Sequence, residues 1–351
     1  MIRIQFYHDF SWHQTSNNSY SIHQPPHTSE TNSSFRQTEE ADLLLDEDET
    51  MNETQNETID LHIQRYNKMK SELLQTLHAN VRILCAVFTV NKPERLNRPA
   101  AIMATWGRRC DQLLFMMASD GGKQLVVKEL NGTNAKMVYL PMLEHYKHLW
   151  QKTKLAIRHI NEHHGGEFDW LLKCDDDAYI FVEHLRRFLV ERSRDASSSS
   201  HYYGVPYRKG TSYNSGGPGY VINNETVREL VNVFDTAPNR VCSRANGGFE
   251  DIEISKCLLR ALNVRAGDTR DTRGRFRFSP FRPQHTINHE TLPKKYRWFK
   301  PMSKFALQEG LDCCANDFIS FHYVNADEIK LIEFLVYYAH PFSDKLTGKQ
   351  W

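Results

Sequence analysis

The sequence predicts an α/β protein built on a mostly parallel β-sheet. Its 351 residues are 40% hydrophobic and 25% charged, which suits a chain that buries one large core or two modest ones and argues against a disordered or fibrous protein. From residue 81 onward, short continuous apolar runs, typical of strands covered on both faces, alternate with segments of helical periodicity. A strand, helix, strand order of this kind indicates parallel strands joined by right-handed crossovers.

The first half contains four predicted strands, at residues 81–90, 113–119, 137–140 and 168–173. A helix is predicted between the last two, because apolar residues recur there at steps of three and four and form one stripe. That stripe consists of Tyr146, Leu149, Trp150, Thr153, Ile157 and Ile160.

The second half continues with YYGVPY at 202–207 and the glycine-rich SGGPGYVI at 215–222. Helices are predicted near 225–235, at 250–262 and at about 326–339. The stretch 265–300 is rich in Arg, Lys, Pro and aromatic residues and shows no period, so we expect long loops there, beside a rigid sheet where loops often carry function.

The first 78 residues differ in composition from the rest. Ser, Thr, Asn, Gln, His and acidic residues dominate, and such a segment cannot bury enough apolar surface to offset its ordering entropy. We therefore expect a disordered stem at 1–78, a catalytic domain at 79–345 and a short tail at 346–351. The acidic run EEADLLLDEDET within the stem is equally consistent with an interaction tail.

Charge and hydropathy bear on partners and compartment. The 44 Lys and Arg residues nearly balance the 43 Asp and Glu residues, so nothing indicates nucleic acid as a partner. No apolar run reaches the roughly 20 residues of a membrane helix, and the N-terminus lacks the apolar stretch of a signal peptide. Seven cysteines and six N-x-S/T triplets nevertheless favour a lumenal or extracellular compartment. The triplets begin at Asn17, Asn32, Asn52, Asn56, Asn131 and Asn224.

The cysteines suggest three bridges and one free thiol. One pair flanks the first strand and a second brackets the helix at 250–262, so each closes a short sequence interval. The last two cysteines are adjacent and either bridge each other or pair elsewhere; we favour the vicinal bridge. The expected pairs are Cys85–Cys110, Cys242–Cys257 and Cys313–Cys314, with Cys174 free.

The strongest chemical signal is the run Asp175, Asp176 and Asp177, directly after the predicted strand at 168–173. Ligands of doubly wound sheets bind at the carboxyl ends of strands, so these carboxylates are well placed to hold a divalent cation. The alternative is a solvated turn that caps the next helix.

Two more residues are candidates for the same site. Asp251, at the start of a predicted helix, is a candidate general base, although acidic residues there are ordinarily caps. His322 in SFHYV would complete with Asp175 and Asp177 an oxygen and nitrogen shell suited to manganese, or it is a core histidine.

The glycines of SGGPGYVI, including Gly217, either let a ligand approach the backbone closely or form a tight turn between strands. Neither GxGxxG nor GxxxxGK[ST] is present, which argues against dinucleotide-binding dehydrogenases and P-loop NTPases. The aromatic cluster Tyr296, Trp298 and Phe299 either stacks on a sugar ring or packs in the interior.

Six motifs in one order carry a family resemblance: LLKCDDDAYIFVEHL, SGGPGYVI, FEDIEISKCL, AGDTRDTRGR, EGLDCC and SFHYV. Over about residues 80–342 the sequence resembles the animal core 1 β1,3-galactosyltransferases, relatives of the fringe glycosyltransferases. The resemblance implies a GT-A-type, Rossmann-like fold. It also implies an inverting, manganese-dependent transfer of galactose from UDP-galactose to the 3-hydroxyl of O-linked N-acetylgalactosamine on Ser or Thr of glycoproteins, which makes the core 1 O-glycan.

The same resemblance assigns roles to individual residues. It implies metal ligation by Asp175, Asp177 and His322, and a catalytic base at Asp251. Donor contacts are implied for Thr89, Lys152, Asp176 and Tyr323, and acceptor contacts for Gly217 and Trp298.

The resemblance further implies residence in the Golgi lumen, a homodimer and a membrane anchor near the N-terminus. No anchor is visible in this sequence, so we expect either a soluble form or an incomplete start. Cys174 replaces the family's usual alanine, and YRWF at 296–299 departs from the usual FWYW, which affects acceptor choice more than donor chemistry. Two alternatives remain: a related β1,3-glycosyltransferase with another acceptor or sugar nucleotide, and a non-catalytic chaperone-like relative, against which the intact DDD, FED and FHYV motifs argue.

Overall fold

The computed structural model describes residues 81–339, except 120, 122, 131, 197–199 and 210, together with a few residues between 64 and 80. Those few residues are helical and exposed. The rest of the expected stem, its four asparagine triplets and the tail at 346–351 lie outside the described residues, as does Asn131.

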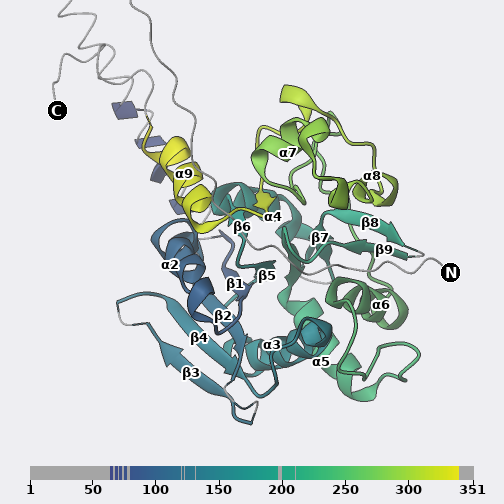
Figure 1. The fold of residues 1–351 in the computed structure, drawn as a ribbon. Helices are drawn as coiled ribbons and strands as arrows, with labels where there is room; N and C mark the ends of the chain where they lie inside the picture. The colour runs from purple at the N-terminus through teal and green to yellow at the C-terminus, as the bar shows by residue number, and fades with distance from the viewer. Residues whose placement is uncertain are drawn as a thin grey trace, which may run out of the picture. The chain divides into compact units, whose positions relative to one another are not determined.

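A seven-stranded sheet forms the centre of the described fold (Figure 1). Across the sheet the strands are β3 (Val126–Glu129), β4 (Ala135–Leu140), β2 (Gln112–Ala118), β1 (Ile83–Phe88), β5 (Trp170–Asp175), β10 (Tyr220–Asn223) and β7 (Tyr202–Gly204). The four strands β4, β2, β1 and β5 pair in parallel, whereas β3 and β10 run antiparallel to their neighbours. The mostly parallel α/β fold is thus confirmed.

The apolar runs form the central strands because both faces of the sheet are covered. In β1, Ile83, Cys85 and Val87 belong to one core cluster, while Leu84, Ala86 and Phe88 belong to the other. Alternate side chains of a strand point to opposite faces, so a strand between two cores is apolar at nearly every position.

Helices form the outer layers. One face is covered by α3 (Leu149–His164), α5 (Asn224–Thr236) and α6 (Glu250–Leu262), and the other by α2 (Asn97–Ala104), α4 (Val182–Ala196) and α9 (Ala326–Tyr337). The predictions at 225–235, 250–262 and 326–339 are confirmed within three residues. The helices α2 and α4 were not predicted.

The prediction that the apolar helical stripe begins at Tyr146 is wrong. The helix begins at Leu149, and Tyr146 belongs to a preceding 3-10 turn with 73% of its surface exposed. Trp150, Ile157 and Ile160 are buried as predicted.

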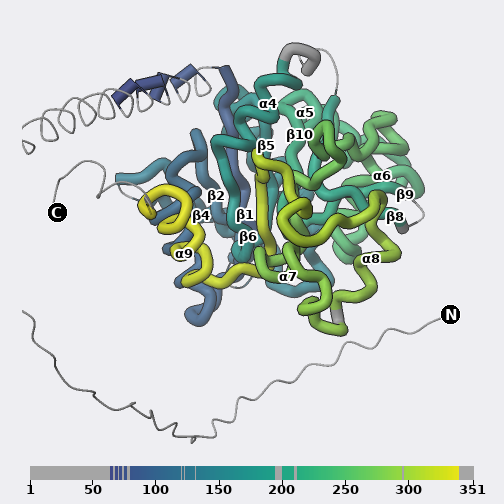
Figure 2. Tube along the Cα trace, turned by 90° about the horizontal axis from the view of Figure 1, so that it is seen from above, coloured from purple at the N-terminus to yellow at the C-terminus, as the bar shows by residue number. Residues whose placement is uncertain are grey.

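Two two-stranded sheets and several short helical turns complete the described fold. Strand β6 (Ala178–Ile180) pairs antiparallel with β11 (Ser320–His322), and β8 (Pro206–Lys209) forms a hairpin with β9 (Thr211–Asn214). The predicted loops at 265–300 contain the short helix α7 (Pro283–Ile287), two 3-10 turns and the start of the short helix α8 (Phe299–Met302). Helix α8 lies beside the β8–β9 hairpin in Figures 1 and 2. The 3-10 turns are η1 (Pro93–Arg95), η2 (Trp106–Arg109), η4 (Tyr146–His148), η5 (His289–Thr291), η6 (Lys294–Tyr296) and η7 (Gly310–Asp312).

The three disulfides join the pairs that the sequence predicted, Cys85–Cys110, Cys242–Cys257 and Cys313–Cys314. Cys174 is free and buried. Among the helices that the structure describes, none combines the length and apolar character needed to cross a membrane.

Candidate active site

The three consecutive aspartates lie at the carboxyl edge of the sheet, where β5 ends. Asp175 is the last residue of β5 and is level with Phe88 at the end of β1. The backbone N–H of Asp176 donates to the Phe88 carbonyl at 3.0 Å, and that of Asp175 donates to the Gly217 carbonyl at 3.2 Å. The aspartates are therefore fixed between two neighbouring strands and the glycine-rich segment.

His322 reaches the aspartates because β11 pairs with β6, which follows them directly, and His322 lies opposite Ala178. Its Nε2 is 3.1 Å from Asp177 Oδ1 and 3.9 Å from Asp175 Oδ2. One ligand atom from each residue falls within 4.8 Å of the others, and the described residues contain no second such group. Two carboxylates and an imidazole suit a divalent cation that accepts oxygen and nitrogen together, such as manganese.

The glycine-rich segment makes room for charged neighbours. A Cβ atom added at Gly217 would overlap the imidazole of His322, and one added at Gly216 would overlap Glu250 Oε1. Because Gly217 has no side chain, its backbone packs directly against the imidazole of His322. The expected contact of Gly217 with the acceptor stays a prediction. The segment also connects β9 to β10, which agrees with the turn interpretation.

Tyr323 packs against the imidazole of His322. Its ring stacks on His322 with centroids 3.9 Å apart and on Tyr296 at 4.9 Å. Its φ of 61° is left-handed, a conformation that costs a side-chain-bearing residue about 1 kcal/mol or more and is concentrated at functional sites. The carbonyl of Tyr323 accepts a 2.6 Å hydrogen bond from Arg282, which secures this backbone.

The middle aspartate is not part of the candidate metal group formed by Asp175, Asp177 and His322. Asp176 accepts hydrogen bonds from Thr89 Oγ1 at 2.7 Å and from Arg98 at 2.6 Å. Burial raises the pKa of Asp176 although Arg98 and Thr89 oppose the shift. For Asp177, burial acts in the same direction, but His322 and Arg98 outweigh it and hold the pKa at about 2. Sequence reasoning missed Arg98, whose contact with Asp176 spans 78 residues.

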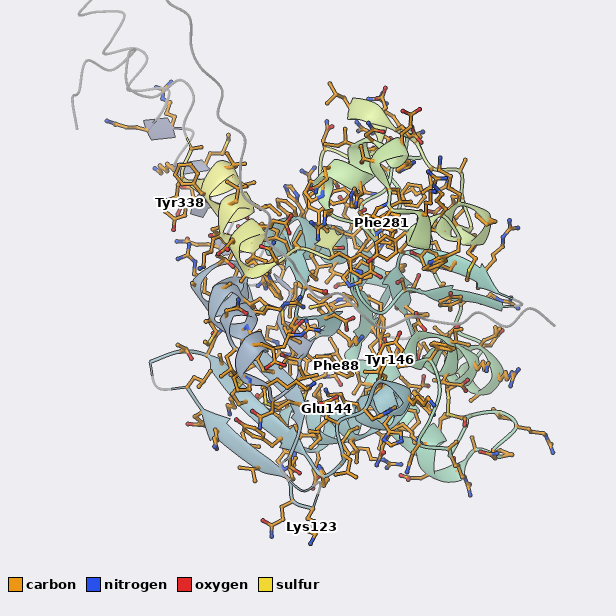
Figure 3. All side chains as sticks on the ribbon, viewed as in Figure 1. Phe88, Lys123, Glu144, Tyr146, Phe281 and Tyr338 are labelled. Atoms are coloured by element: carbon orange, nitrogen blue, oxygen red, sulfur yellow. A yellow bond between two sulfur atoms is a disulfide. The ribbon has the colours of Figure 1, made fainter. Side chains whose placement is uncertain are left out.

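The Lys152 ammonium, expected to contact the donor, is bound by protein groups in this structure. Its side chain is buried, and Nζ donates to the Thr89 carbonyl at 2.6 Å and to Glu144 Oε2 at 2.8 Å. Burial lowers the pKa of Lys152, with Glu144 opposing the shift. The ammonium therefore fixes the end of β1, and with it Thr89; Glu144, which the sequence did not single out, is labelled in Figure 3.

Asp251 lies in the first turn of α6. Its Oδ1 accepts the N–H of Ile252 at 2.9 Å, while Phe249, at the N-cap, makes no side-chain capping bond. Burial and the nearby charge of Glu250 raise the pKa of Asp251 to about 7, against the opposing effect of Lys173. A carboxyl that titrates near neutral pH is well matched to accept a proton from a hydroxyl group.

Comparison with known proteins identifies the family. The sequence model of the family described as galactosyltransferase matches residues 97–227. Glycoprotein-N-acetylgalactosamine 3-beta-galactosyltransferase 1 of Xenopus laevis is 30% identical over 287 residues, which cover 80% of this chain and 72% of the frog protein. The chain belongs to this galactosyltransferase family. Chondroitin sulfate synthase 3 of human and of mouse is 25% identical over 122 residues, or 31% of this chain and 13% of each synthase.

Because the chain belongs to this family, it is classed as a glycosyltransferase. The matched segment contains Asp175, Asp177 and Gly217 but ends before Asp251 and His322. A proposal for these last two residues therefore depends on their geometry.

The predicted aromatic cluster divides among three environments. Phe299 is buried, and Tyr296 stacks on Tyr323. Trp298 keeps 45% of its surface exposed and meets the buried Tyr207 ring edge-on, with centroids 6.2 Å apart. Of the three residues, Trp298 has the largest exposed fraction.

Proposed function

We propose that this chain is an inverting β1,3-galactosyltransferase that moves galactose from UDP-galactose to the 3-hydroxyl of N-acetylgalactosamine on Ser or Thr of glycoproteins. The observation that carries the proposal is the Asp175, Asp177 and His322 group at the carboxyl edge of the sheet, in a chain of this family. The acceptor and the linkage are taken from the activity for which the frog relative is named.

The donor would bind where the ends of β1 and β5 meet. Asp175, Asp177 and His322 would hold Mn²⁺, which when bound supplies positive charge to offset the charge that builds on the UDP leaving group. Thr89 and Asp176, joined by a 2.7 Å hydrogen bond, would contact the nucleoside, and Tyr323 would contact the donor beside His322.

Asp251 would act on the acceptor. Its carboxylate would take the proton of the 3-hydroxyl while the oxygen attacks the anomeric carbon from the face opposite UDP. The new carbon–oxygen bond forms as the bond to the diphosphate breaks, so the anomeric configuration inverts. With a pKa of about 7, a large fraction of Asp251 is already ionised at neutral pH.

The acceptor sugar would reach the site beside Trp298, whose exposed ring offers an apolar face, with Gly217 bordering the metal group. Three disulfides are consistent with an oxidising compartment, and we propose the Golgi lumen of the secretory pathway. A homodimer, expected from the family resemblance, forms part of the same proposal.

The test is transfer to a defined acceptor. Purified protein is incubated with UDP-galactose and a GalNAc-α-Thr peptide, with Mn²⁺ or with EDTA, and the product linkage is determined by NMR. We expect a β1,3-linked galactose in the Mn²⁺ sample alone, and no product from UDP-GlcNAc or UDP-GalNAc. Transfer to a different acceptor would replace the proposed substrate, and the absence of both transfer and UDP-galactose hydrolysis would favour the non-catalytic, chaperone-like alternative.

A further inference from the structure

One buried cation in the site has no role in the reaction described above. Lys173 lies on β5 two residues before Asp175, so both side chains leave the same face of the strand. Only 5% of the Lys173 side chain is exposed. A lysine in the middle of an otherwise apolar, buried strand requires partners for its charge.

The partners of Lys173 use all three of its N–H donors. Nζ donates to Glu250 Oε1 at 2.7 Å, to Asp175 Oδ1 at 3.0 Å and to the Gly216 carbonyl at 3.3 Å. The Phe88 ring packs against the same ammonium at 4.7 Å. Lys173 thus ties together the end of β5, the start of α6 and the glycine-rich segment, leaving no donor for a ligand.

The two carboxylate oxygens of Asp175 have different partners because Lys173 binds one of them. Oδ1 accepts from Lys173, while Oδ2 faces His322 Nε2 at 3.9 Å. We infer that Lys173 is a positioning residue: it occupies one oxygen of Asp175 so that the other points into the metal group. This inference rests on the proposed function only in taking the Asp175, Asp177 and His322 group to be a cation site.

Glu250 completes the arrangement from the other side. Its Oε2 lies 3.3 Å from the Tyr220 hydroxyl, which donates to it, and only 5% of its side chain is exposed. Glu250 therefore holds the Lys173 ammonium within hydrogen-bonding distance of Asp175. A Cβ atom at Gly216 would displace the Glu250 carboxylate. Partners that orient metal ligands in this way typically contribute ten- to hundredfold to metal affinity.

The test measures binding of Mn²⁺ alone, by titration calorimetry and by the rise in melting temperature, in the full chain. We expect Lys173→Met to bind Mn²⁺ about ten- to hundredfold more weakly than the unmodified protein. Lys154→Met is the control, since the Lys154 ammonium donates to the carbonyls of Arg244 and Ala245 and lies over the Trp150 ring, contacts that include none of Asp175, Asp177 and His322. Equal Mn²⁺ affinity in the Lys173 and Lys154 variants would overturn the inference.

Lys173→Met leaves Glu250 buried without its cation and is expected to be less stable. The double variant Lys173→Met with Glu250→Gln removes both charges, and we expect it to recover the melting temperature while its Mn²⁺ affinity stays low. Recovery of the affinity together with the stability would show that Lys173 acts only through the fold. If the unmodified chain binds no Mn²⁺, both this inference and the proposed metal fail; if it binds Mn²⁺ but transfers no galactose, only the proposed function fails.

Discussion

Replacing Asp251 by asparagine would separate the chemistry of this residue from its effect on stability. Burial and Glu250 raise the pKa of Asp251 from 3.8 to about 7, so the folded state favours the protonated carboxyl. A difference of about 3 in pKa at 1.36 kcal/mol each corresponds to a cost of about 4 kcal/mol to the folded protein above about pH 7.

Asparagine removes this cost but keeps only one of the two backbone hydrogen bonds that the carboxylate accepts, from Ile252 and Gly216, a loss of about 1 kcal/mol. We therefore expect Asp251→Asn to raise the free energy of unfolding by about 3 kcal/mol near pH 8. The sign follows from linkage. The raised pKa makes the wild type lose stability as the pH rises from about 4 to about 7, so the advantage of the variant grows over that range and is absent below it.

The assay pairs unfolding with turnover. Urea unfolding of the metal-free protein near pH 8 and near pH 4 gives the stability difference, and transfer from UDP-galactose gives the rate. We expect turnover to fall about a hundredfold or more, with unchanged binding of UDP and Mn²⁺, whereas wild-type activity rises with pH up to about 7 and then levels.

Glu253→Gln is the control, because Glu253 lies in the same helical turn and pairs with Lys256 instead. It should retain full turnover and nearly unchanged stability. Near-normal turnover in Asp251→Asn, or a loss of stability near pH 8, would refute the reasoning. Full loss of turnover in Glu250→Gln with normal turnover in Asp251→Asn would identify Glu250 as the base.

Three further predictions concern the metal group and the disulfides. Asp177→Ala should abolish both transfer and the Mn²⁺-induced rise in melting temperature, since no neighbouring carboxylate can replace its charge; near-normal turnover at limiting Mn²⁺ would contradict its assignment as a ligand. Gly217→Ala should weaken Mn²⁺ binding at least tenfold by displacing the imidazole, whereas Gly166→Ala, where an added Cβ meets no atom within 4 Å, should leave binding unchanged. Opening the Cys242–Cys257 bridge by a double serine substitution should lower the free energy of unfolding by about 3 kcal/mol for its 15-residue loop, and free thiols at these positions in secreted material would exclude the bridge.

The sequence alone predicts the elements that obey a local rule. The strands β1, β2 and β5 are continuous apolar runs, and a run of that kind is stable only between two covered layers. Helix α6 was predicted at its observed bounds because its apolar positions recur with the helical period. Strand β3 was missed, since all four of its residues are exposed and it has no buried face to create a pattern.

The site was only partly accessible to the same reasoning. The consecutive aspartates follow a predicted strand, and in a parallel sheet that position is an edge where ligands bind, so their role could be inferred from the chain order. That His322 would join Asp175 and Asp177 depends on β11 pairing with β6, and local periodicity carries no information about which strands pair.

Ion pairs between residues far apart in the sequence could not be predicted from the sequence pattern. Lys173 meets Glu250 across 77 residues of sequence, and Arg98 meets Asp176 across 78. Apolar periodicity records only whether a position is buried on its own strand or helix. Which charges meet is determined by how the helices and loops pack over the sheet, through many weak contacts that no single segment contains. The pKa of Asp251 near 7, on which its proposed catalytic role depends, is consequently a property of the tertiary structure.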